Sequence, residues 1–124
     1  MAIIDDDWAL LETAGALLQR AGLDVATYHG RFDRLGFLLR EQPELLLLDV
    51  NMPAVSGDEL FVLLREHPHL GQIPVVFFSS NDENDLRLLV RERGARGYLS
   101  KSWLGRDFAA RVERFLPPLM PPAA

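Results

Sequence analysis

The chain has no cysteine and a single lysine, Lys101, beside twelve arginines. Without cysteine, disulfide bonds, thiolate metal sites and cysteine catalysis are all excluded. Long apolar runs are also missing: a typical one, Leu45–Leu48, is far shorter than the ~20 residues that cross a bilayer. The 13 basic side chains are outnumbered by 18 acidic ones, for a net charge of −5. This balance argues against a nucleic-acid surface, where a basic stripe is expected.

The composition that remains is that of a globular domain. Of the 124 residues, 48% are hydrophobic and 25% are charged, which is enough apolar material for a core. The first residues, Met1–Ile4, lead directly into acidic ones and lack the basic and then apolar pattern of a signal peptide. We therefore expect a cytoplasmic protein with one domain over 1–116 and a proline-rich tail or linker stub over 117–124.

Short apolar segments alternate with stretches in which apolar residues recur at helical spacing. The predicted strands are Ala2–Ile4, Val25–Tyr28, Leu45–Leu48, Val75–Phe78 and Gly97–Leu99. The predicted helices cover Trp8–Ala21, Phe32–Leu39, Asp58–His67, the region around Leu86–Val90, and Phe108–Phe115. The leucine run alone is ambiguous with helix, but its brevity and the preceding Pro43 favour a strand. Five strand–helix units predict an α/β fold, a doubly wound five-stranded parallel sheet with helices on both faces.

Polar side chains follow the ends of four of these strands. Right-handed crossovers bring the carboxyl ends of parallel strands to one edge, where such sheets bind ligands. The residues that meet there are Asp5, Asp6 and Asp7 after the first strand, Asp49 after the third, Ser79 and Ser80 after the fourth, and Ser100 and Lys101 after the fifth. We expect these groups to form one site.

The chemistry of this set points to a metal ion and a phosphoryl group. Clustered carboxylates repel one another, and a hard dication with a preference for oxygen ligands offsets that repulsion. The ammonium of Lys101 and a serine hydroxyl supply charge and hydrogen bonds for phosphate oxygens. Simpler roles stay open: Asp7 as a helix cap, Asp5 and Asp6 as a solvated cluster, and Asp49 as a turn former.

In this order and spacing, the residues resemble the receiver domains of response regulators in two-component systems. The resemblance covers roughly Ala2 to Leu116. It rests on five signatures: Ile4-Asp5-Asp6, Leu48-Asp49-Val50-Asn51-Met52-Pro53, Gly57, Pro74-Val75-Val76-Phe77-Phe78-Ser79, and Tyr98-Leu99-Ser100-Lys101. It implies a flavodoxin-like (βα)5 fold with strand order 2-1-3-4-5.

The resemblance also implies roles for the acidic residues. Asp49 is expected to be the phosphoacceptor and a metal ligand. Asp5 and Asp6 are expected to bind the metal, Mg²⁺ or Mn²⁺, together with the backbone carbonyl of Asn51. For that role, the side chain of Asn51 need not be asparagine.

The remaining implied roles concern phosphate binding and switching. Lys101 is expected to pair with the phosphate, and Ser79 to follow the phosphoryl group on activation. Tyr98 occupies the aromatic switch position. One departure stands out: the family usually has proline after the lysine, in a cis peptide, whereas this chain has Ser102. The sequence leaves open whether the Lys101–Ser102 bond is cis or trans.

The expected function is that of a phosphoacceptor in a two-component phosphorelay, which switches a protein-interaction face. The expected donor is a sensor histidine kinase or a histidine phosphotransfer protein, with no nucleic-acid or membrane partner. Homodimer formation is left open. The chain would catalyse its own phosphorylation and dephosphorylation, but would not turn over a separate substrate as an enzyme. The alternatives are a pseudo-receiver that only binds proteins, and an aspartate-nucleophile phosphatase. The phosphatase would need a second acid at the position of Asn51.

Overall fold

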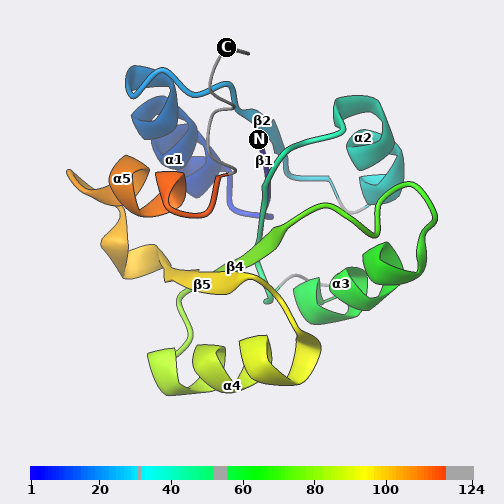
Figure 1. The fold of residues 1–124 in the computed structure, drawn as a ribbon. Coiled ribbons are helices and arrows are strands. Elements are labelled where there is room, and N and C mark those ends of the chain that lie inside the picture. Colours follow the sequence, from blue (N-terminus) through cyan, green and yellow to red (C-terminus); the bar gives the residue numbers. More distant parts are fainter. Residues whose placement is uncertain (31, 52–55, 117–124) are drawn as a thin grey trace, which may run out of the picture.

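A five-stranded parallel sheet forms the centre of the computed structural model, which describes residues 1–30, 32–51 and 56–116 (Figure 1). The strand order is β2-β1-β3-β4-β5, as the resemblance implied. The strands are β1 (Ala2–Ile4), β2 (Ala26–Tyr28), β3 (Leu46–Leu48), β4 (Val75–Ser79) and β5 (Gly97–Ser100). The helices are α1 (Trp8–Arg20), α2 (Arg34–Glu41), α3 (Gly57–Glu66), α4 (Glu83–Arg93) and α5 (Phe108–Glu113), with a 3-10 turn at Lys101–Trp103.

The helices cover both faces of the sheet, so the fold prediction is confirmed. Helices α1 and α5 lie on one face, and α2, α3 and α4 lie on the other (Figure 1). Successive strand residues point to opposite faces. In β4, Val76 and Phe78 pack with the α1/α5 core, while Val75 and Phe77 pack with the other core. Burial on both faces explains why the strands are continuous apolar runs.

The strand register brings the predicted site together. Ile4 of β1 pairs with Leu48 of β3, which in turn pairs with Phe77 of β4. The residues that follow Ile4 and Leu48 therefore leave the sheet side by side. At the far end of β4, Ser79 pairs with Ser100 of β5. The acids, the hydroxyls and Lys101 thus meet at the carboxyl edge, as the sequence predicted.

Most helix ends follow local sequence signals, but two helices differ from the prediction. Helix α2 begins at Arg34, so Phe32, predicted to mark this helix, lies before it and is exposed. Gly22, just beyond α1, adopts a φ of 85°, a conformation that glycine tolerates and that ends helices. The last helix is shorter than predicted: α5 ends at Glu113, and Phe115 lies beyond it. The Phe115 ring packs so closely on Gly97 of β5 that a Cβ there would lie 2.6 Å from it. The apolar repeat that suggested a longer helix therefore reflects packing against β5. The predicted tail, 117–124, and Met52 and Pro53 of the motif lie outside the described residues.

Asp7 caps helix α1, which confirms the simpler of its two sequence interpretations. Its side chain accepts a hydrogen bond from the backbone N–H of Leu10 at 3.2 Å. Loss of such a cap costs about 1 kcal/mol of stability. We therefore expect Asp7→Ala to lower the free energy of unfolding by about this amount, measured by urea denaturation. An unchanged stability would contradict the capping role.

None of the helices in the described ranges combines the length and the apolar character that a membrane span requires.

Candidate functional site

Two buried carboxylates from neighbouring strands share one ammonium group. Asp5 follows β1 and Asp49 follows β3, and both side chains are almost completely buried. Nζ of Lys101 lies 2.8 Å from Oδ2 of Asp5 and 3.4 Å from Oδ2 of Asp49. The lysine comes from the 3-10 turn after β5, and its ammonium contacts both acids. The ammonium thereby offsets part of the desolvation cost of burying the two carboxylates.

The remaining oxygens of the two acids hold the backbone in place. Oδ1 of Asp5 accepts a hydrogen bond from the N–H of Asp7 at 2.9 Å. Oδ1 of Asp49 accepts one from the N–H of Asn51 at 3.1 Å. Each carboxylate therefore fixes the start of its own loop, which orients the side chain toward the shared site.

The site holds three carboxylates and one ammonium, and this imbalance together with burial shifts the pKa of its buried groups. Burial raises the pKa of Asp5 from 3.8 to about 6; the Lys101 ammonium opposes this change, and the charge of Asp49 adds to it. Burial acts to lower the pKa of Lys101, but the two carboxylates prevail and raise it above its ordinary value. Lys101 therefore stays charged near neutral pH, while Asp5 is held as an ion only against a desolvation cost.

The three predicted metal ligands do come together. Oxygen atoms of Asp5, Asp6 and Asp49 all lie within 4.8 Å of one another, with Asp6 exposed and the other two buried. All the donors are hard carboxylate oxygens, which suit Mg²⁺ or Mn²⁺. Oδ2 of Asp5 contacts the ammonium but has no directional hydrogen bond in the described part of the chain. The donor set therefore fits a divalent cation, whose charge would offset the cost of burying Asp5.

The backbone after Lys101 resolves the departure from the family pattern. No cis peptide bond occurs in the described ranges, so the Lys101–Ser102 bond is trans. Oγ of Ser100 accepts a hydrogen bond from the N–H of Ser102 at 3.2 Å and lies 2.7 Å from Oγ of Ser102. The two serines thus stabilise the 3-10 turn, and Lys101 still reaches both acids.

Ser79, the predicted phosphate-binding hydroxyl, is completely buried at the end of β4. It accepts hydrogen bonds from Nδ2 of Asn51 at 3.0 Å and from the N–H of Asn81 at 3.1 Å. Sequence reasoning gave Asn51 only a backbone role and did not consider Asn81. The sequence does contain a signal for this contact. Asn51 lies two residues beyond Asp49 and Asn81 lies two residues beyond Ser79, at the ends of the adjacent parallel strands β3 and β4.

Tyr98, at the predicted switch position, is half-buried on β5. Its hydroxyl donates a hydrogen bond to Oε1 of Glu83 on α4 at 3.0 Å. Its ring lies 5.9 Å from the ring of Trp103, centroid to centroid, and Arg111 of α5 stacks on Trp103 at 4.4 Å. The aromatic pair therefore connects α4, β5 and α5 on one surface.

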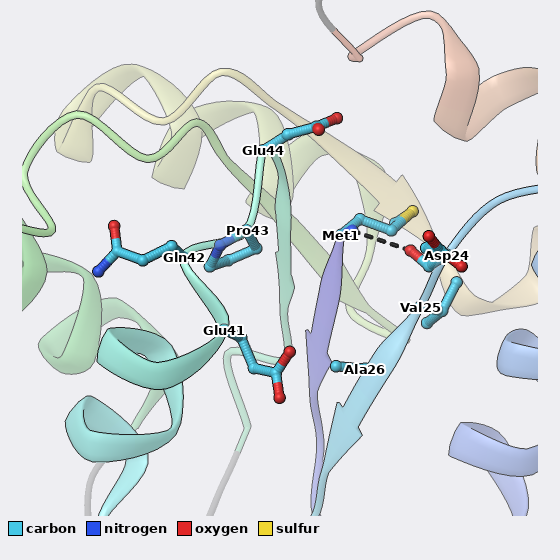
Figure 2. Close-up of a pocket in the computed structure, with 8 residues that line it drawn as sticks. All are labelled: Met1, Asp24, Val25, Ala26, Glu41, Gln42, Pro43 and Glu44. Carbon is cyan, nitrogen blue, oxygen red and sulfur yellow. Dashed lines mark hydrogen bonds between the residues drawn. The ribbon is translucent and has the colours of Figure 1, made fainter.

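A surface pocket at the opposite edge of the sheet includes none of these residues. Figure 2 shows it at the amino ends of β1, β2 and β3, with Asp24, Glu41 and Glu44 among its lining residues. The amino group of Met1 donates a hydrogen bond to the carbonyl of Asp24 there, at 2.9 Å. The groups with catalytic potential are instead gathered at the carboxyl edge.

Comparisons with known proteins show the family and the fold of the chain. The family model of the response regulator receiver domain matches residues 1–113. The transcriptional regulatory protein CreB of Escherichia coli (strain K12) is 33% identical over 92% of this chain and 49% of CreB. The BeF3-activated N-terminal receiver domain of Klebsiella pneumoniae RstA is 28% identical, with a TM-score of 0.80 over 94% of this chain and 97% of that chain.

Chemotaxis response regulator CheY4 of Vibrio cholerae, at 22% identity, has the same fold, with a TM-score of 0.81 over 93% of this chain and 96% of that chain. This chain spans about half the length of curated relatives such as CreB. On the family match and the shared fold, this chain belongs to the response regulator receiver domain family.

Proposed function

We propose that Asp49 accepts a phosphoryl group from a phosphohistidine and that a divalent cation, Mg²⁺ or Mn²⁺, is required. The observation that carries the proposal is the position of Lys101, whose ammonium bridges the buried carboxylates of Asp5 and Asp49. A purely structural ion pair needs one acid for one lysine. Here a second buried acid and the exposed Asp6 add negative charge that Lys101 alone does not balance, so the site can take a further cation.

In the proposed reaction, a carboxylate oxygen of Asp49 attacks the donor phosphorus. The new O–P bond forms as the P–N bond to the histidine breaks, and the imidazole leaves with its electron pair and takes up a proton. Asp5, Asp6, Asp49 and the backbone carbonyl of Asn51 would hold the cation, which supplies charge stabilisation for the phosphoryl oxygens. Lys101 neutralises another of those oxygens, and the Ser79 hydroxyl donates to a third. Water later attacks phosphorus, which returns the free carboxylate and inorganic phosphate.

The proposed output is a protein contact on the surface formed by α4, β5 and α5. Tyr98 and Trp103 lie on this surface, and the hydroxyl of Tyr98 donates a hydrogen bond to Glu83 of α4. We propose that occupancy of Asp49 changes the position of Tyr98 and so alters the affinity for a partner protein or for a second copy of the chain. The pseudo-receiver alternative is disfavoured, because it gives no reason for burying two acids against one lysine.

Intact-mass spectrometry tests the proposal. The protein is incubated with Mg²⁺ and a small phosphodonor such as acetyl phosphate. We expect the mass of one phosphoryl group to be added, and we expect EDTA to prevent the addition. Asp49→Asn should add none, because the amide is not a nucleophile of comparable strength.

The matched control is Asp24→Asn, the same change at an exposed aspartate on the opposite edge of the sheet. It should be phosphorylated as the unaltered protein is. Phosphoryl addition that persists in Asp49→Asn, or no addition to the unaltered protein, would refute the assignment of Asp49.

A further inference from the structure

The side chain of Asn51 links the loop after β3 to the end of β4. Its amide nitrogen donates to Oγ of Ser79 at 3.0 Å and to Oδ1 of Asn81 at 2.6 Å. Asn81 also donates its backbone N–H to Oγ of Ser79 at 3.1 Å. The three residues therefore form a closed set of hydrogen bonds, which we call the Asn51–Ser79–Asn81 triangle.

The hydrogen bonds of the triangle leave only the donor function of the Ser79 hydroxyl free. The carboxamide of Asn51 has two N–H donors, and both are used. The hydroxyl oxygen of Ser79 has two acceptor positions, and both are filled. No acceptor for its hydroxyl proton occurs among the described residues. The oxygen is thus held from two sides, while its donor function stays available.

Asn51 also contacts the phosphoacceptor. Its backbone N–H donates to Oδ1 of Asp49 at 3.1 Å, so one residue touches Asp49 through its main chain and Ser79 through its side chain. A phosphoryl group on Asp49 would change the first of these contacts directly. Asn51 is therefore placed to link the state of Asp49 to the position of Ser79.

We propose that Asn51, supported by Asn81, is a positioning residue that holds the Ser79 hydroxyl in its resting place. The proposal rests on the function proposed above, in which Ser79 donates to the phosphoryl group. In that function Ser79 moves toward the phosphoryl group, and a displaced Oγ loses the hydrogen bond that it accepts from Asn51 in this structure. The strength of this bond then opposes the active arrangement and keeps the unphosphorylated protein in its resting state.

Removing the carboxamide should therefore favour the phosphorylated arrangement. A single neutral hydrogen bond contributes a modest net free energy, equivalent to about a fivefold change in an equilibrium constant. We expect Asn51→Ala to bind beryllofluoride, a phosphoryl mimic, about fivefold more tightly at saturating Mg²⁺. Asn81→Ala should act in the same direction but less strongly, because Asn51 can still bond to Ser79.

The decisive experiment is a double-mutant cycle, in which beryllofluoride is titrated into four proteins. They are the unaltered chain, Asn51→Ala, Ser79→Ala and the double variant. If Asn51 acts through Ser79, Asn51→Ala raises the affinity for beryllofluoride when Ser79 is present. The same change has no effect on the affinity when Ser79 is alanine. Equal gains in both backgrounds, or no gain in either, would overturn the proposal. Asn84→Ala, the same change at the exposed third asparagine, should leave the affinity unchanged.

A second measurement does not depend on phosphoryl chemistry. The N–H of Asn81 donates to Ser79 Oγ, so its hydrogen-exchange rate reports how firmly that oxygen is held. We expect about fivefold faster exchange in Asn51→Ala and no change in Asn84→Ala. If none of the proteins binds beryllofluoride, the proposed function fails, and the exchange rate alone decides the positioning role. Unchanged exchange in Asn51→Ala would overturn that role.

Discussion

Asp5→Asn is expected to make the metal-free protein more stable and, at the same time, to remove its affinity for Mg²⁺. The carboxylate of Asp5 is fully buried beside a second acid, and burial raises its pKa to about 6. The folded state therefore holds an ion that the surroundings disfavour. Asparagine has the same shape without the charge, so the desolvation cost disappears. A carboxylate ligand of the proposed cation disappears with it.

The size and the pH dependence of this effect follow from the pKa. Between pH 3.8 and about 6, the folded protein retains a proton that the unfolded chain has lost, so stability falls as the pH rises through this window. Above this window Asp5 is ionised in the folded protein, and the whole desolvation cost of its charge lowers the stability. A shift of this size corresponds to about 3 kcal/mol, a net figure that already includes the attraction of Lys101. We therefore expect a net gain of about 1–3 kcal/mol at pH 7.5 and almost none below pH 4.

Urea denaturation in EDTA, at both pH values, measures this gain. Asp6→Asn is the matched control, because Asp6 is exposed and its charge has no comparable burial cost. Mg²⁺ should raise the stability of the unaltered protein by binding to the folded state, and should have little effect on Asp5→Asn. Lower stability of Asp5→Asn at neutral pH would show that the Lys101 ion pair outweighs the cost of burial.

Gly57→Ala is expected to cost about 3 kcal/mol or more of stability and to disturb the site itself. A Cβ at this position would lie 1.9 Å from the carbonyl oxygen of Asp49 and 2.7 Å from its carbonyl carbon. Both contacts are with backbone, which cannot rotate away as a flexible side chain could. The loop that carries Asp49 and the start of α3 would have to separate.

The control for this change is Gly105→Ala, where an added Cβ meets nothing within 4 Å. It should leave the stability within about 0.5 kcal/mol of the unaltered protein, as for most surface substitutions. Urea denaturation of the two variants gives the comparison. If Gly57→Ala were as stable as Gly105→Ala, the close approach of α3 to Asp49 would not exist in solution.

The sequence predicted the sheet and most of the site because both depend on short-range patterns. Runs such as Leu45–Leu48 indicate burial on both faces, and acids placed directly after them must emerge at the carboxyl edge. The prediction of Asp5, Asp49 and Lys101 as neighbours needed only strand ends and the right-handed crossover rule. The structure places all three in contact.

What the sequence did not predict depends on loop geometry. The contact of Asn51 with Ser79 joins residues 28 positions apart and needs particular conformations of two loops. The geometry at Ser102 was left open because a family signature with proline gives no guide to a chain without it. Here the hydroxyl and backbone contacts of Ser100 determine the turn. Neither feature follows from periodicity or strand order.

Chemical trapping identifies which carboxylate takes the phosphoryl group, and we expect it to be Asp49. An acyl phosphate on aspartate is reduced by borohydride to homoserine with release of phosphate, whereas an unmodified carboxylate is not. The protein is treated with Mg²⁺ and acetyl phosphate, then reduced and digested, and the peptides are sequenced by mass spectrometry. We predict homoserine in place of Asp49 alone, and none when EDTA is present. Homoserine in place of Asp5 or Asp6, or none at all with Mg²⁺ present, would show that Asp49 is not the phosphoacceptor.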